Sequence, residues 1–162
     1  MNNHLISVIE ESFKIELFIA DIYNLFYNLF PEDKKFWWKL LMEEKNHAAL
    51  VRSGKEFLKS GMDFPDELFH NNLENLEYMS SKLSSMIKDF KKKPPSREEA
   101  FNYALKIENS ACEVHFQKFM DEESDIKIGE IFRKLNEEDK DHENRIRAYM
   151  IDNDIKFKPP EK

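Results

Sequence analysis

The sequence predicts an all-α fold, a four-helix up-down bundle with one long crossover between its second and third helices. Only 3 Gly and 6 Pro occur in 162 residues, which is too few for a fold built from many tight turns. Long segments carry apolar residues three and four positions apart, the pattern of an amphipathic helix. The breaks between these segments are short, long and short, as in a bundle with one crossover connection.

The first break separates two helices. A segment from 3 to 29 precedes Pro31, and a second segment runs to about Ser60, where Gly61 follows. Proline is tolerated in the first turn of a helix, where its missing N–H would be unpaired in any case. These residues therefore predict a tight helical hairpin.

The segment from about 61 to 96 has a different character and predicts the crossover. It contains Pro65, a polar helix-like stretch from 73 to 90, a lysine run and Pro94-Pro95. Because proline interrupts helical hydrogen bonding, a new helix is expected to begin only after the proline pair.

The third and fourth helices follow the crossover. Ser96 and Glu99 have the spacing of a capping box, which predicts a helix start at this point and an end near Glu122. The fourth helix is expected from about Asp125 to about Tyr149. We predict a single domain over 1–150 and a charged C-terminal tail over 151–162.

Composition excludes several classes of function. A net charge of −7 argues against general affinity for nucleic acid or anionic membranes. A lone cysteine, Cys112, excludes an internal disulfide framework and a four-cysteine metal site. No run of 18 apolar residues occurs, and acids stand near the N-terminus where a signal peptide would carry bases. We therefore expect a cytoplasmic protein with neither nucleic acid nor a membrane as partner.

Each predicted helix places one carboxylate near the middle of its apolar stripe. In two of them a histidine follows the acid by three residues, so that both side chains share one helix face. The acids are Glu16, Glu44, Glu108 and Asp139, and the histidines are His47 and His142.

Four carboxylates in one core require positive charge. Burying an isolated carboxylate in a low-dielectric interior costs several kcal/mol of folding free energy. No Lys or Arg shares the four stripes. Two divalent metal ions would balance the four acids, and carboxylate oxygen with imidazole nitrogen suits iron or manganese. The stripes therefore predict a two-metal site.

The spacing of the acids links the two halves of the chain. Glu16 precedes Glu44 by 28 residues, and Glu108 precedes Asp139 by 31. Glu16 and Tyr23 are seven residues apart, as are Glu108 and His115. The second helix pair is therefore interpreted as a diverged copy of the first, with the metal pair on a pseudo-twofold axis.

These residues resemble the ferritin-like diiron proteins, and within them the rubrerythrin-like group. The resemblance covers about 5–60 and 97–150, and rests on Glu16 with Tyr23, Glu108, WWKLLMEEKNH at 37–47 and LNEEDKDH at 135–142. It implies that Glu16 and Glu108 are terminal ligands of one metal each. It also implies that Glu44 and Asp139 bridge both metals, while His47 and His142 each cap one.

The resemblance also implies an activity. Rubrerythrin-like proteins use two iron ions to reduce hydrogen peroxide or dioxygen in oxidative-stress defence, so we expect a non-haem diiron oxidoreductase, with manganese or zinc as possible replacements, in a homodimer. Rubrerythrins usually carry a four-cysteine rubredoxin-like domain, which one cysteine cannot build. The electrons are therefore expected from an external donor such as a rubredoxin-like protein.

Two further departures from the family concern the metal ligands. Ala111 stands where rubrerythrins place a second glutamate, a metal ligand that exchanges with a histidine when the irons change oxidation state. Alanine cannot ligate a metal, so this chain lacks the residue for peroxidase activity by that exchange. Asp139 is one methylene shorter than the usual glutamate, which can change the metal–metal distance.

Alternatives stay open for the function and for individual residues. The same centre could oxidise iron for storage, or the chain could be a metal-stabilised helical bundle without catalysis. Tyr23 is interpreted as a core aromatic or as a neighbour of the ligands. His115 lies two turns from Glu108, too far to share its metal, so it is interpreted as a neighbour of the ligands, as part of an entry path, or as a buried histidine. Trp37 and Trp38 are predicted to lie in the core.

Overall fold

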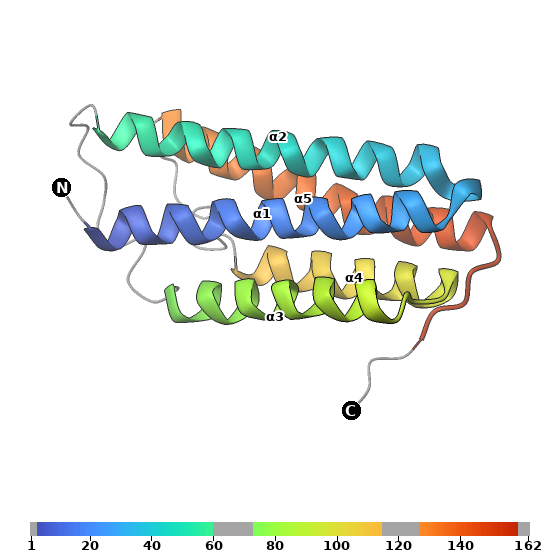
Figure 1. Cartoon of the computed structure of the whole chain (residues 1–162). Helices are drawn as coiled ribbons and strands as arrows, with labels where there is room; N and C mark the ends of the chain where they lie inside the picture. The colour runs from blue at the N-terminus through green and yellow to red at the C-terminus, as the bar shows by residue number, and fades with distance from the viewer. Residues whose placement is uncertain (1–2, 60–72, 115–126, 159–162) are drawn as a thin grey trace.

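The computed structural model describes residues 3–59, 73–114 and 127–158, and every element within these ranges is a helix (Figure 1). This confirms the predicted all-α class. The elements are α1 (Asn3–Leu29), the short 3-10 helix η1 (Pro31–Asp33), α2 (Lys34–Lys59), α3 (Leu73–Lys92), α4 (Arg97–Val114) and α5 (Lys127–Asp152).

The predicted hairpin between the first two helices is present. The backbone N–H of Phe30 donates to the carbonyl of Phe26 at 3.0 Å as the last turn of α1 ends. Pro31 then opens η1, where its missing N–H costs no hydrogen bond. After η1 the chain reverses, so that α2 runs antiparallel to α1 and packs along it (Figure 1).

The predicted crossover contains a helix that contributes to the core. α3 packs against α1, and its buried residues recur every three or four positions, which makes it amphipathic. Figure 1 shows α3 running opposite to both α2 and α4, so it carries the chain back along the molecule. The prediction of a polar connection missed this apolar face, which comprises Leu76, Met79, Ser80, Leu83, Ile87 and Phe90.

The predicted capping box opens α4. The backbone N–H of Ser96 donates to Glu99 Oε2 at 2.9 Å, and the N–H of Glu99 donates to Ser96 Oγ at 3.3 Å. α4 packs against α5, which also contacts α2 (Figure 1). The predicted end of the third helix near Glu122 lies outside the described residues.

The two tryptophans have different environments. Trp37 is fully buried and packs on Phe101 with ring centroids 4.4 Å apart, as predicted. The core assignment of Trp38 is wrong, because its side chain is 51% exposed and its ring lies 5.8 Å from that of Tyr27 at the surface. Successive residues on a helix point about 100° apart, so only one of the pair can face the interior.

The C-terminal end of α5 is fixed by backbone hydrogen bonds. The N–H of Ile155 donates to the carbonyl of Met150 at 2.9 Å, and that of Asp154 donates to Ile151 at 3.3 Å. Asp154 has φ 53°, so this is a Schellman cap with a non-glycine residue in the left-handed position. Ile155 is buried, so the start of the predicted tail packs against the helices.

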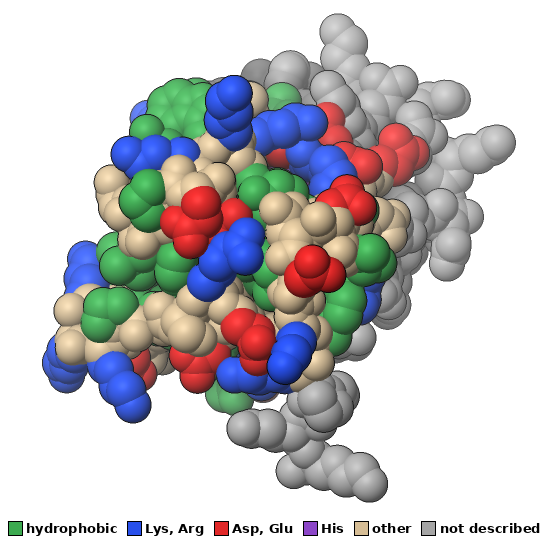
Figure 2. Space-filling view, turned by 90° about the vertical axis from the view of Figure 1, so that its right-hand side faces the viewer, with side chains coloured by type: hydrophobic (Ala, Val, Ile, Leu, Met, Phe, Trp, Pro, Cys, Tyr) green, Lys and Arg blue, Asp and Glu red, His purple; other side chains and the backbone are tan. Residues whose placement is uncertain are grey.

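None of the described helices combines the length and apolar character needed to cross a membrane. Figure 2 looks onto the end of the molecule where η1 joins α1 to α2. Basic and acidic side chains intermingle over this face, with hydrophobic atoms between them. No single sign of charge dominates the view.

Candidate metal centre

Three of the predicted carboxylates lie together inside the molecule. Glu16 of α1, Glu44 of α2 and Glu108 of α4 are at most 3% exposed. Each occupies the apolar stripe of its helix, so burial of the stripe carries the acid inward. The predicted register is therefore confirmed for these three residues.

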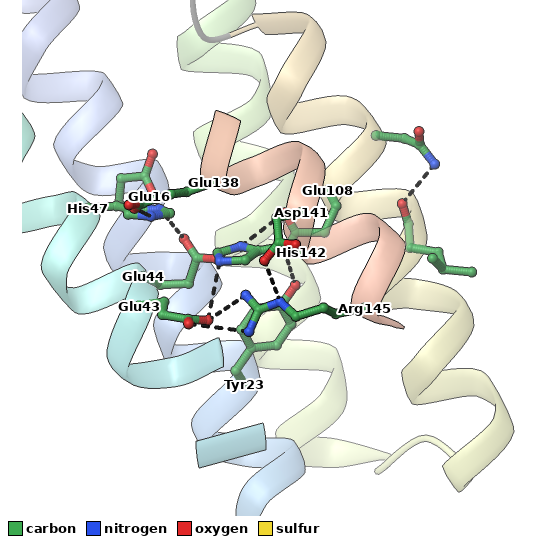
Figure 3. Close-up of polar contacts among 12 residues, drawn as sticks. Glu16, Tyr23, Glu43, Glu44, His47, Glu108, Glu138, Asp141, His142 and Arg145 are labelled. Carbon is green, nitrogen blue, oxygen red and sulfur yellow. Dashed lines mark hydrogen bonds and ion pairs between the residues drawn. The ribbon is translucent and has the colours of Figure 1, made fainter. Parts of the chain in front are cut away.

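Both predicted histidines join this cluster through the same ring nitrogen (Figure 3). His47 Nδ1 lies 3.3 Å from Glu44 and 3.7 Å from Glu16. His142 Nδ1 lies 2.8 Å from Glu44 and 3.6 Å from Glu108. The two rings stack with centroids 5.2 Å apart and an interplanar angle of 13°, so Glu44 is shared by both imidazoles.

The donor set fits a metal ion. Glu44, His47 and His142 each offer one ligand atom, and these atoms lie within 4.8 Å of one another. His142 Nδ1 and Glu44 Oε1 are both buried and lie 2.8 Å apart as an ion pair, without the alignment of a hydrogen bond. Buried polar atoms normally have hydrogen-bond partners, and a metal ion shared by these two atoms would satisfy both.

Outside the cluster, a second set of charged groups contacts the other ring nitrogens (Figure 3). His47 Nε2 lies 2.9 Å from Glu138 of α5, and His142 Nε2 lies 3.4 Å from Glu43 of α2. Glu43 in turn accepts two hydrogen bonds from Arg145, at 2.6 and 3.2 Å. Each histidine thus lies between inner carboxylates and an outer one.

Tyr23 also contacts the cluster. It is fully buried, and its hydroxyl donates a hydrogen bond to Glu108. Tyr23 is therefore a core aromatic whose hydroxyl contacts Glu108, and its role as a neighbour of metal ligands stays a prediction.

Neighbouring charges decide the protonation of the histidines. Burial disfavours a charged His47, but contacts with Glu16 and Glu44 outweigh burial and raise its pKa to about 11. Burial likewise opposes the charge on His142, whose contacts with Glu108, Glu43 and Glu44 raise its pKa far above the ordinary value. In the metal-free protein at neutral pH, both imidazoles are therefore positively charged, with a proton on each ring nitrogen.

The same contacts act on the acids. Burial tends to raise the pKa of Glu44, but its contacts with His142 and His47 lower it overall. Burial also tends to raise the pKa of Glu43, but its contacts with His142 and Arg145 outweigh burial and lower the pKa to about 2. The argument that the stripes lack cations thus overlooked the histidines themselves, which supply two positive charges when protonated.

Two predicted residues cannot be placed in the cluster. The side chain of Asp139 lies outside the described part of α5, and His115 lies outside the described residues altogether. The side chain of Ala111 is outside the described set as well. Their assignments stay predictions.

The sequence interpretation missed Glu43, Glu138 and Arg145. A signal for the first two was available, because EEKNH at 43–47 and EDKDH at 138–142 place a glutamate four residues before each histidine. Arg145 has no such signal, since Leu50 occupies the corresponding position of the first copy.

No protein family, curated protein or solved structure matches this chain. The resemblance to rubrerythrin-like proteins therefore stays an expectation from the sequence.

Proposed function

We propose that the chain is a rubrerythrin-like, non-haem diiron oxidoreductase that reduces hydrogen peroxide or dioxygen with electrons from an external donor. Its metal ligands would be Glu16, Glu44, His47, Glu108, Asp139 and His142. The observation that carries this proposal is the convergence of five of these residues, from four helices, on one buried cluster.

The arrangement of the helices supports the ferritin-like part of the proposal. We assign α1, α2, α4 and α5 to a four-helix bundle and α3 to its crossover. α2 and α4 run in the same direction in Figure 1, and α3 carries the chain back between them. A four-helix bundle with one long crossover has this connectivity.

The residues of the chain have separate tasks in such a centre. Glu44 lies between the two histidines, so its carboxylate would hold the metal together with His47 and His142. Tyr23 donates to Glu108 and restricts the orientation of that carboxylate. The bound iron pair would supply the electrons that reduce the oxidant.

The same geometry specifies an order of events on binding. A metal could bind His47 Nδ1 and His142 Nδ1 only after each nitrogen has lost its proton, because a histidine binds metal through an unprotonated ring nitrogen. Metal uptake should therefore release protons.

A metal-stabilised or metal-free bundle is the competing function, and one observation favours it. The protonated histidines offset part of the buried negative charge, so the cluster has positive charge of its own without a metal. The two functions differ in metal stoichiometry and in turnover, which makes them separable.

The first prediction is that purified protein loaded anaerobically with Fe²⁺ binds two ions per chain and then consumes hydrogen peroxide when a chemical reductant is supplied. Glu44→Ala and His142→Ala each remove a shared or capping ligand, and both should lower uptake to fewer than two ions. Asn46→Ala is the matched control, since Asn46 is exposed on α2 between Glu44 and His47. Metal analysis and peroxide consumption provide the readouts.

Uptake of far less than two irons by the wild type contradicts the proposal, as do ligand variants that bind iron like the control. Two bound irons without peroxide or dioxygen consumption would support a metal-stabilised bundle. A cage of many chains that accumulates many irons per chain would support iron storage.

A further inference from the structure

A continuous series of aromatic rings leads away from the buried cluster. The hydroxyl of Tyr23 donates to Glu108 (Figure 3), and the ring of Tyr23 packs on Trp37 with centroids 5.7 Å apart. The centroid of Trp37 lies 4.4 Å from that of Phe101 and 5.2 Å from that of Phe36. Tyr23, Trp37 and Phe101 are fully buried, so this part of the series is shielded from water.

The series ends at Tyr149, which is half-buried. Its ring stacks on that of Phe36 with centroids 4.1 Å apart and on that of Phe101 at 5.4 Å. Both phenylalanines therefore join Tyr149 to Trp37. The hydroxyl of Tyr149 donates to Asp33 Oδ1 at 2.9 Å. The rings thus connect the buried cluster with the end of the molecule where η1 joins α1 to α2.

Trp37 and Tyr149 differ in what can happen to their protons. Tyrosine and tryptophan are the aromatic side chains that give up one electron most readily, and an oxidised phenol is a strong acid. Asp33 accepts the hydrogen bond of Tyr149 and can take that proton. A buried indole N–H normally has an acceptor, but Trp37 Nε1 has none within the described residues. Trp37 can therefore pass on an electron without transferring a proton.

We infer that Tyr23, Trp37 and Tyr149 form an electron relay between the buried centre and the end of the molecule at η1. Phe36 and Phe101 fill the space between Trp37 and Tyr149 and hold the rings in contact. The inference rests on the proposed function and deepens it, because it names the place where a reductant delivers electrons.

The electrons and protons of the relay balance. One hydrogen peroxide, two protons from the solvent and two electrons give two waters, and the relay supplies the electrons one at a time. Tyr149 gives an electron to Trp37 and its phenolic proton to Asp33. Trp37 gives an electron to Tyr23 and so to the centre. The external one-electron donor then reduces Tyr149, which recovers its proton from Asp33.

A photosensitiser placed beside Tyr149 tests the relay. The side chain of Glu32 is 57% exposed and lies 3.8 Å from Arg97, the residue that pairs with Asp33. Glu32→Cys, combined with Cys112→Ala so that only one thiol is present, would be labelled with a ruthenium–bipyridine complex and loaded anaerobically with Fe²⁺. A light flash with an electron acceptor present oxidises the ruthenium. The oxidised ruthenium should then oxidise Tyr149 to a tyrosyl radical, which transient absorption detects.

The lifetime of the Tyr149 radical reports on the inner part of the relay. In the iron-loaded protein the radical should be short-lived, because an electron from Fe²⁺ reaches it through Trp37. In the metal-free protein it should persist. Trp37→Phe and Tyr23→Phe, each verified for bound iron and for helicity by circular dichroism, should lengthen the lifetime towards the metal-free value. Tyr149→Phe should give no such radical.

Two variants control for these substitutions. Trp38→Phe changes the neighbouring tryptophan, which is 51% exposed and contacts Tyr27. Tyr103→Phe changes a half-buried tyrosine of α4 that packs on Phe90 and is not a member of the relay. Both variants should show the wild-type radical lifetime.

Wild-type lifetimes in both Trp37→Phe and Tyr23→Phe overturn the relay, and so does a lifetime that bound Fe²⁺ does not shorten. The same radical in Tyr149→Phe also overturns it. These outcomes leave the proposed function intact where the wild type binds two irons and consumes hydrogen peroxide. A wild type that binds no iron overturns the proposed function together with the relay.

Discussion

Glu44 holds the central position among the buried groups. Its carboxylate is within 3.3 Å of both His47 and His142, which come from different helices. The resemblance to diiron proteins implies a bridging role for Glu44, and that role stays a prediction. Asp139 is expected to bridge from the other side.

Tyr23 provides a test of this cluster in the absence of metal. Tyr23→Phe removes the only side-chain hydroxyl found on Glu108 within the described residues. A hydrogen bond to a buried charged acceptor contributes about 1.5–3 kcal/mol. We expect the free energy of unfolding, measured in urea with chelator present, to fall by this amount.

Tyr27→Phe is the matched control for this measurement, because it removes a hydroxyl from a half-buried ring of the same helix. A loss at Tyr23→Phe no larger than that of the control would show that the hydroxyl does not stabilise Glu108.

At the level of the helices, the contacts between α2 and α5 and between α3 and α1 shape the molecule. α2 and α5 carry corresponding repeats and contact each other, which allows their outer glutamates to exchange partners. α3 has no counterpart in the repeat and instead covers α1. An amphipathic helix thus shields the apolar surface of α1.

The C-terminal cap of α5 predicts a stabilising substitution. Asp154 adopts φ 53°, a conformation that glycine reaches without steric cost. Asp154→Gly should raise the free energy of unfolding by about 0.5–1 kcal/mol, as measured by urea denaturation. Asp152→Gly is the contrasting variant, because Asp152 is the last residue of α5 and glycine weakens a helix. Equal effects from both substitutions would contradict this account of the cap.

At the level of the whole molecule, one charged network joins three segments distant in sequence. Asp33 of η1 is buried and accepts two hydrogen bonds from Arg97 of α4, both at 2.8 Å. It also accepts a hydrogen bond from the Tyr149 hydroxyl of α5 at 2.9 Å. This network lies at the end of the molecule where η1 joins α1 to α2, opposite the N-termini of α1 and α3 (Figure 1).

The network predicts a dependence of stability on alkaline pH. Burial and the hydrogen bond to Asp33 raise the pKa of Tyr149 above its ordinary value of 10.0. The folded state therefore holds this proton more tightly than the unfolded state, so the stabilisation is complete below pH 10 and is lost as the pH rises further. Tyr149→Phe should lower the free energy of unfolding by about 1 kcal/mol at neutral pH.

The difference between wild type and Tyr149→Phe should shrink when urea denaturation is repeated above pH 10. Tyr78→Phe, at an exposed ring of α3, controls for tyrosine titration in general. A pH-independent difference would show that the Tyr149 hydroxyl is not coupled to Asp33.

Much of this could be predicted from local patterns. Apolar periodicity placed Glu16, Glu44 and Glu108 on interior faces, since the register of a helix decides which side chains turn inward. Pro31 and the Ser96–Glu99 capping box located helix boundaries, because both act on backbone groups only a few residues away.

Contacts between helices could not be read in the same way. The pairing of Glu43 with His142 and of Glu138 with His47 depends on how α2 and α5 cross, and the burial of α3 depends on the surface that α1 presents. The charge of the histidines is likewise a property of the assembled cluster, because neighbouring carboxylates raise their pKa only when tertiary packing brings them within a few ångströms.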